Sequence, residues 1–200
     1  MAVLLSEHEE DMTRLGGFLK DTSMARTASE ETIIRRFWHR IPWLLIGLAG
    51  ALLTADVVAA FEDQLRRRVI LAFFIPDIVY LADAVGTQTE TVVVRGLSVG
   101  VGIRRIAWQE LLTGACVGLA LSLAFFPMAL WRWGSGDLAL AVSLSLFAAA
   151  TAATVVGLTL PWLLERLGWD PAFGTGPVST VVQDLLSILA YFAISGVVMR

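Results

Sequence analysis

Charged residues are scarce in this chain of 200 residues: only 16% are Asp, Glu, Lys or Arg, whereas 56% are hydrophobic. An average soluble domain has about 25% charged residues, so this composition excludes an ordinary soluble domain of this size. The small number of basic residues leaves no dense basic face to neutralise phosphates, which excludes nucleic acid as a partner. High hydrophobicity with a net charge of only −3 also excludes disorder for most of the chain. The composition therefore indicates an integral membrane protein, with the lipid bilayer as its surroundings.

Cysteine and histidine are almost absent. The single cysteine, Cys116, lies in an apolar stretch, and both histidines precede the first apolar run. One thiol permits no intrachain disulfide and no cysteine-based metal site within one chain. A secretory signal is lacking as well, because the chain begins with the acidic stretch 6–11 in place of a basic segment leading into an apolar one. We therefore expect residues 1–36 to be a short polar cytoplasmic segment ahead of a membrane domain of residues 37–200.

Five apolar windows are long enough for a bilayer helix, which needs roughly 20 residues. The windows cover residues 41–61, 69–96, 107–131, 138–164 and 176–199. The seven tryptophans fall at or near the ends of these windows, as expected for residues that prefer the membrane interface. The predicted fold class is an all-α integral membrane protein with five transmembrane helices per subunit, so that the two termini lie on opposite sides of the membrane.

The distribution of basic residues favours one orientation in the cell (inner) membrane. With the N-terminus in the cytoplasm, ten Lys and Arg residues lie inside and five outside, which agrees with the positive-inside rule and puts the C-terminus outside. The run 66–68 of three arginines opposes this assignment. Glu62 and Asp63 beside that run can tether a short outer loop.

Paired glycines are spaced for close contact between membrane helices. Gly96 with Gly100, and Gly114 with Gly118, have the small-residue spacing that permits such contact, although glycine is also simply common in membrane helices. The chain has no internal repeat, so an inverted-repeat transporter within one chain is not supported. A pore would therefore need a dimer.

Acidic residues inside the spans are the main functional signal. Each costs about 2.5–3.5 kcal/mol on insertion scales, so such residues normally face a bundle interior or a watery cavity. They are Asp56, Asp77, Asp83, Glu90 and Asp184. Asp56 and Glu90 can also lie at the interface, and Asp77 can serve as a helix cap. Asp184 is the hardest to explain structurally, because its helix offers no basic partner.

Helical spacing collects polar side chains into one stripe on each of two spans. The stripe of the fifth span contains Thr180, Asp184, Ser187 and Tyr191. The stripe of the second contains Asp77, Tyr80, Asp83, Thr87, Glu90 and Thr91. Pro76 and Gly86 lie within the second stripe and can free backbone carbonyls as ligands. A path lined by oxygen alone suits a hard cation such as Mg²⁺ or Ca²⁺, and Mn²⁺ is also compatible.

A segment rich in proline and glycine precedes the fifth span. Residues 170–177 read Asp-Pro-Ala-Phe-Gly-Thr-Gly-Pro, a composition that is typical of a loop because proline and glycine disfavour helix. We expect a shaped loop that enters the membrane, and a plain linker would have the same composition.

Three segments, in this order along the chain, carry a family resemblance. The first is 40–44, the second is 74–76 with 86–88 and 94–97, and the third is 170–172 with 176–177, Thr180, Asp184 and 191–192. In order and spacing they resemble the MgtE family of magnesium channels and its eukaryotic solute-carrier relatives. The resemblance covers residues 37–200 and corresponds to the family's membrane domain.

The resemblance implies a homodimer with a central ion path lined by the second and fifth helices of each subunit. It places Asp184 at the ion-selective site, where this aspartate and its dimer mate would bind a largely hydrated Mg²⁺. Mg²⁺ sheds water reluctantly, so carboxylates that hold the hydrated ion can select it and still release it. The complete set of candidate metal-site residues is Asp184, Asp83, Asp77, Glu90, Gly86, Gln88, Thr180 and Asp170.

Two departures from the family pattern affect these expectations. Where the family's second span usually reads Gly-Asn-Ala-Gly, this chain has Asp83-Ala-Val-Gly86. The added acids Asp77, Asp83 and Glu90 can bind an ion more directly. Transport of Mn²⁺ or Co²⁺, or coupling to protons, is therefore an alternative to Mg²⁺ conduction. The best-known bacterial members also carry an acidic N domain and paired CBS domains ahead of the membrane. Gating by that sensor would here need a separate regulatory subunit.

Two other classes of function compete with cation transport. A membrane aspartyl protease would use paired carboxylates such as Asp83 and Asp184. The chain lacks the Gly-x-Gly-Asp context of those proteases, and it lacks His-Glu-x-x-His and Gly-x-Ser-x-Gly. We therefore predict that the protein is not an enzyme. A non-conducting subunit of a transport complex is the other alternative, and it would tolerate loss of Asp184.

Overall fold

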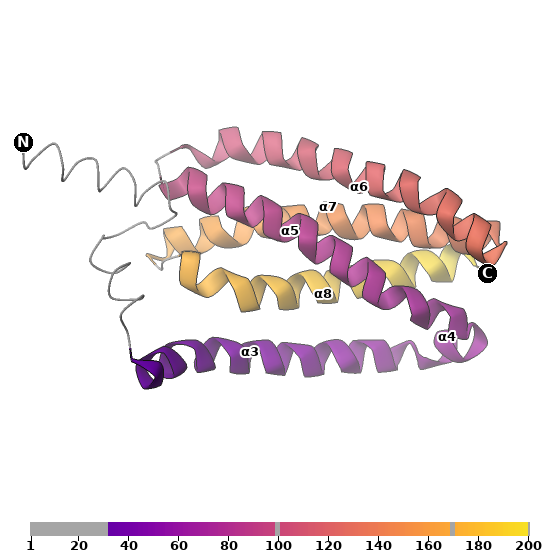
Figure 1. The fold of residues 1–200 in the computed structure, drawn as a ribbon, viewed down its shortest axis with the longest axis horizontal. Coiled ribbons are helices and arrows are strands. Elements are labelled where there is room, and N and C mark those ends of the chain that lie inside the picture. The colour runs from indigo at the N-terminus through magenta and orange to yellow at the C-terminus, as the bar shows by residue number, and fades with distance from the viewer. Residues whose placement is uncertain (1–31, 99–100, 169–170, 200) are drawn as a thin grey trace, which may run out of the picture.

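The computed structural model describes residues 32–98, 101–168 and 171–199. All regular elements in these ranges are helical. They are α3 (Ile33–Ala60), α4 (Glu62–Arg67), the 3-10 helix η1 (Val69–Phe74), α5 (Ile75–Ser98), α6 (Ile103–Trp133), α7 (Gly136–Arg166) and α8 (Pro171–Val198) (Figure 1).

Five stretches of these helices are long and apolar enough to cross a membrane. They are Arg40–Ala60, Val69–Leu97, Ile103–Trp133, Gly136–Arg166 and Thr175–Val198. These spans match the five predicted windows to within a few residues, so the all-α, five-span prediction is confirmed. The predicted polar segment 1–36 lies mostly outside the described residues, and α3 begins within its last part, at Ile33.

Helix α7 is the centre of the bundle, because α5, α6 and α8 all pack against it. Its buried surface consists largely of small side chains, which let neighbouring helix backbones approach closely. These residues are Ala139, Ala141, Ser143, Ser145, Ala149, Ala150, Ala153, Thr154 and Gly157. Figure 1 shows α5, α6 and α8 gathered around α7, while α3 runs along one side of the bundle.

The glycine pair of α6 makes the close helix contact that its spacing predicts. A Cβ at Gly114 would overlap the side chain of Thr154, and one at Gly118 would lie 3.1 Å from the Cβ of Ala150. Both neighbours belong to α7. Of the other pair, Gly96 approaches Ile106, whereas Gly100 lies outside the described residues.

Helix α3 is attached to the bundle mainly through α8, which runs parallel to it. Contacts recur in register along the two helices: Gly47 lies against Pro177, Gly50 against Val181, and Phe61 stacks on Phe192 with ring centroids 4.4 Å apart. At the end of the pair, the Gln64 amide donates to Ser195 Oγ at 2.9 Å. The rest of α3 faces outward, and only 6% of its apolar window is buried.

The expectation of a loop at 170–177 is wrong for the described part of that segment. Helix α8 begins at Pro171 and continues through Pro177. Proline is well suited to the first position of a helix, where its missing N–H has no intrahelical partner. Pro177 removes one backbone hydrogen bond, but leaving the helix inside a membrane would expose many more unpaired groups. The helix therefore tolerates the second proline.

The second span also begins differently from the prediction. Pro76 lies in the first turn of α5, after the 3-10 helix η1. Pro76 therefore marks the junction of η1 and α5 within the second span, where the Leu71 carbonyl accepts a hydrogen bond from the Tyr191 hydroxyl. The short connection between the first two spans is helical as well: within α4, Arg66 pairs with Glu62 at 2.8 Å.

Candidate functional site

Helices α5 and α8 cross at Gly86 of α5, where the absence of a side chain lets the two helices approach closely. A Cβ at Gly86 would overlap the amide of Gln183 on α8. On another side, a Cβ at Gly157 of α7 would lie only 2.5 Å from the Gly86 carbonyl oxygen. Three helices therefore meet at Gly86. The Gln183 side chain is enclosed there, with 1% of its surface exposed, and its Nε2 donates to Ser179 Oγ.

Two carboxylates lie at this crossing. Asp83 precedes Gly86 by one helical turn on α5, and Asp184 follows Gln183 directly on α8. Both side chains are half-buried, and they lie close enough for their charges to interact. The structure thus brings together the two acids that the sequence placed on separate polar stripes.

Several buried side-chain oxygens have no hydrogen-bond partner within the described part of the chain. They are Asp83 Oδ1 on α5, Gln183 Oε1 and Ser187 Oγ on α8, and Ser143 Oγ elsewhere on α7. Other buried hydroxyls, including those of Ser145 and Ser195, donate to the carbonyl four residues earlier at 2.7 Å. Buried polar groups without a partner are costly, so each needs an explanation. At the α5–α8 crossing, these oxygens can accept hydrogen bonds from water carried by a cation.

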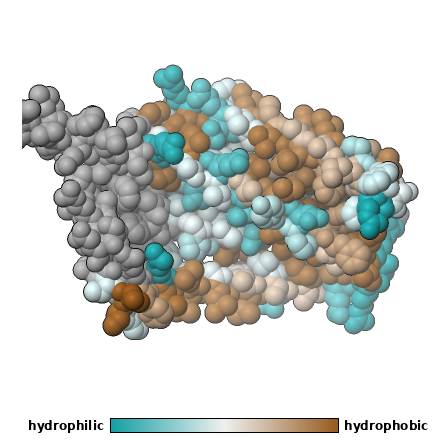
Figure 2. All heavy atoms as spheres, viewed as in Figure 1, coloured by the Kyte–Doolittle hydropathy of each residue, from teal (hydrophilic) through white to brown (hydrophobic). Residues whose placement is uncertain are grey.

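The outer face of α5 is polar although the helix spans the membrane. Its exposed residues include Asp77, Tyr80, Thr87, Gln88 and Thr91, and Tyr80 is 73% exposed. Figure 2 shows pale to teal surface along α5 above the brown, apolar surface of α3. Polar groups in a span normally face protein or water. This face of α5 is therefore suited to a second polypeptide or to an aqueous path.

The predicted stripe of α8 divides into two parts. Thr180 is exposed and Asp184 is half-buried. Around the circumference of α8, Asp184 lies between two packed faces. Val181 on one face contacts α3, and Gln183 on the other contacts α5. Further along, the hydroxyl of the fully buried Tyr191 donates to the Leu71 carbonyl at 2.8 Å. Thr180 and Asp184 are thus available to a ligand, whereas Tyr191 ties α8 to η1.

The remaining candidate residues lie away from the carboxylate pair. Glu90 is half-buried two turns beyond Asp83, with its backbone nitrogen close to Gly157. Asp77 and Gln88 are exposed on the outer face of α5, and Asp56 is exposed on α3. Asp170 lies outside the described residues. Over the described ranges, no three Asp, Glu, His or Cys side chains gather as a metal site.

Gln183, an enclosed polar residue at the crossing, was not among the residues predicted for the site. The sequence does indicate this position, because Ser179, Gln183 and Ser187 recur every four residues. Residues at this spacing share one face of a helix. This second polar face of α8 packs toward α5, beside the face of Thr180 and Asp184.

Known proteins resemble the chain over most of its length. Residues 75–194 match the family model MgtE, described as a divalent cation transporter. The magnesium transporter MgtE of Bacillus subtilis is 32% identical over 197 residues, covering 96% of this chain and 43% of that protein. The magnesium transporter MgtE of Enterococcus faecalis is 32% identical over 166 residues, covering 80% of this chain and 36% of that protein.

A third relative, the magnesium transporter MgtE of Thermus thermophilus, is 29% identical over 198 residues, covering 96% of this chain and 43% of that protein. The chain thus spans less than half the length of these relatives. The family match covers more than half of the chain and includes α5, α6 and α7 with most of α8. On this evidence, the chain belongs to the MgtE family.

Proposed function

We propose that this chain forms the conducting membrane part of a divalent cation channel or transporter whose ion is Mg²⁺. The observation that carries the proposal is the pair of carboxylates, Asp83 and Asp184, at the crossing of two membrane-spanning helices. Unpaired oxygens of Gln183 and Ser187 adjoin the pair. The magnesium transporters that match the chain support the choice of ion.

The path follows α5 and α8 and is completed by a second copy of the chain. One subunit leaves the polar outer face of α5 exposed, and a homodimer would cover that face while keeping water between the subunits. In such an arrangement Asp184 of each subunit would face the shared path. Thr180, Asp77 and Gln88 lie exposed on the same two helices and would line it.

The site is suited to an ion that keeps most of its water. Mg²⁺ dehydrates reluctantly and binds proteins through few direct carboxylate ligands. Carboxylates attract the dication, and neutral oxygens such as Gln183 Oε1 accept hydrogen bonds from its water shell. Weak contacts through water also allow rapid release, which conduction requires. Glu90, two turns from Asp83, would be the next carboxylate along the path to attract the ion.

Gly86 has a structural role in this proposal. It admits Gln183 to the crossing and so fixes how closely α5 and α8 approach. Asp170 remains a candidate for the metal site from the family resemblance alone.

Proton coupling is the second candidate, and the carboxylate pair itself favours it. Neighbouring acids that bind a dication can also exchange protons. In a passive channel the membrane potential would drive uptake into a negative-inside cell, by about 2.3 kcal/mol per elementary charge per 100 mV. An antiporter would instead respond to a pH gradient.

The test is flux of Mg²⁺, Mn²⁺, Co²⁺ and Ca²⁺ into proteoliposomes, measured with and without a pH gradient. Mg²⁺ flux that follows the membrane potential and ignores the pH gradient supports the channel. Flux that reverses with the pH gradient supports proton coupling. Absence of flux for every ion would favour a non-conducting subunit of a transport complex.

A further inference from the structure

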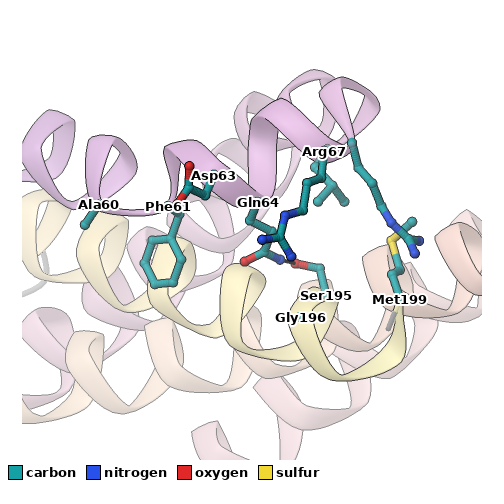
Figure 3. Close-up of a pocket in the computed structure, with 10 residues that line it drawn as sticks. Ala60, Phe61, Asp63, Gln64, Arg67, Ser195, Gly196 and Met199 are labelled. Carbon is teal, nitrogen blue, oxygen red and sulfur yellow. Dashed lines mark hydrogen bonds between the residues drawn. The ribbon is translucent and has the colours of Figure 1, made fainter.

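A pocket of about 480 Å³ lies at the end of the bundle opposite the start of α3, between α4 and the C-terminal part of α8. Figure 3 shows its residues, with Phe61, Gln64 and Arg67 on one side and Ser195 and Met199 on the other. Gln64 joins the two sides, since its amide donates to Ser195 Oγ and to the Phe192 carbonyl. The pocket is distinct from the carboxylate pair of the candidate ion path.

The pocket contains two cationic side chains that lack a partner among the described residues. Of the three consecutive arginines, Arg66 is neutralised by Glu62, with two hydrogen bonds to one carboxylate oxygen. Arg67 and Arg68 line the pocket instead, and neither guanidinium group has a hydrogen bond or ion pair in the described ranges. Asp63 is the acidic residue of the lining, which leaves an excess of positive charge.

The pocket lies where the chain leaves the apolar part of the membrane. Span residues end at Ala60 and Val198, and the next span begins at Val69. The lining combines the arginines with apolar residues such as Leu71 and Met199. Val69 and Val197, beside the pocket residues in sequence, are exposed and apolar. The pocket thus combines positive charge with apolar lining at the edge of the membrane-spanning segments. These features match a molecule that is anionic at one end and apolar at the other.

We propose that this pocket binds the phosphate group of an anionic phospholipid through Arg67 and Arg68, with the acyl chains along the neighbouring apolar surface. Guanidinium groups bind phosphate oxygens through paired, charge-assisted hydrogen bonds. Binding would tie α4 to α8 at the membrane surface, and it would also account for three arginines in a loop that the positive-inside rule disfavours.

The experiment measures thermal stabilisation of the purified full chain in detergent by added phosphatidylglycerol, with phosphatidylcholine and inorganic phosphate as separate additions. The test variant is Arg67→Gln/Arg68→Gln. The matched control is Arg104→Gln/Arg105→Gln, which removes the same charge from two exposed arginines at the start of α6. Each arginine near an anionic lipid contributes roughly a fivefold factor in affinity, so the test variant should bind phosphatidylglycerol roughly 25-fold more weakly.

The expected result is stabilisation by phosphatidylglycerol, but not by phosphatidylcholine, in the wild type and the control, and its loss in the test variant. Equal stabilisation by both lipids, or equal loss in both variants, would overturn the proposal. Equal stabilisation by inorganic phosphate would show a site for free anions and overturn the lipid assignment. A subunit mass by light scattering that falls in the test variant alone would show an interface between copies instead.

A second variant blocks the pocket and retains both arginines. A Cβ at Gly196 would lie 3.6 Å from Gln64 Nε2, an ordinary contact distance, and Gly196 lines the pocket, so the ring of Gly196→Phe should extend into that space. It should lose stabilisation by phosphatidylglycerol and keep the unfolding temperature of the lipid-free wild type. Unchanged lipid binding in this variant would show that the lipid lies elsewhere.

Discussion

At the scale of single residues, the most informative position is Asp83. Its carboxylate lies close enough to that of Asp184 for their charges to interact, and its Oδ1 has no partner among the residues described. The family resemblance leads us to expect a glycine at this position, where this chain has an acid. An additional carboxylate at the crossing would favour ions that exchange water for direct ligands more readily than Mg²⁺ does.

The substitution Asp83→Gly should therefore raise the preference for Mg²⁺ over Mn²⁺. Loss of one carboxylate contact should change the ratio of the two fluxes roughly tenfold, which corresponds to about 1.4 kcal/mol. Competition between the two ions in proteoliposome flux measures this ratio. Asp56→Gly is the control, because Asp56 is an exposed acid within a span on α3, outside the two helices of the proposed path. An unchanged ratio would make Asp83 a structural residue.

Gly86 allows a prediction about stability. In Gly86→Ala the new methyl group would overlap the Gln183 amide, and overpacking of this kind costs about 1–3 kcal/mol. Thermal unfolding should show the loss, and adding Gln183→Ser should recover most of it by removing the overlapping atoms. Gly176→Ala in α8 is the control, because a Cβ there meets nothing within 4 Å. A stable Gly86→Ala protein would contradict the close crossing of α5 and α8.

At the scale of helices, the existence and order of the spans could be predicted because apolar length alone sets them. The structure of 171–177 could not, because proline and glycine signal a loop only where water can satisfy the freed backbone groups. In the bundle the backbone stays helical through Pro177, which contacts α3, although proline and glycine locally disfavour a helix. The same reasoning explains why Pro76 marks a helix start and not a break.

The parallel packing of α3 on α8 gives a prediction at this scale. A Cβ built on Gly47 lies 3.6 Å from the Cβ of Pro177, within the range for a disulfide. In a Cys116→Ser background, Gly47→Cys/Pro177→Cys should therefore form an intrachain disulfide on mild oxidation, detected by mass spectrometry of the linked peptides. Gly47→Cys/Gly176→Cys is the control, because Gly176 faces open space. Linkage between two chains would show that α3 packs on the other subunit.

At the scale of the whole molecule, the exposed face of α5 distinguishes an aqueous path from a lipid-facing surface. Tyr80 on that face is 73% exposed, and Leu119 on α6 is 50% exposed near the middle of its span. In reconstituted vesicles, with Cys116 replaced by Ser, Tyr80→Cys should react with a charged, membrane-impermeant thiol reagent. Leu119→Cys should react at least tenfold more slowly, because thiolates do not form in lipid. Equal rates would place α5 against lipid.

The individual acids of the candidate site were predictable, and their grouping was not. Asp83 and Asp184 were recognisable because charge inside a span is costly. Their proximity depends on where α5 and α8 cross, which is determined by the fit of Gln183 against Gly86 and of Gly86 against Gly157. Such three-helix packing has no periodic signature. The predicted stripe of the second span is divided in the same way, because packing half-buries Asp83 and leaves Asp77 exposed.

The central claim is that Asp184 is the ion-selective residue of the path. The most direct measurement is Mg²⁺ flux into proteoliposomes for the wild type, Asp184→Ala and Asp56→Ala, each first shown to be folded and of unchanged subunit mass. Asp56 is the matched control, because it is an exposed acid on α3 within a span. We predict at least a tenfold loss of flux for Asp184→Ala and wild-type flux for Asp56→Ala. Undiminished, Mg²⁺-selective flux in Asp184→Ala would contradict the account.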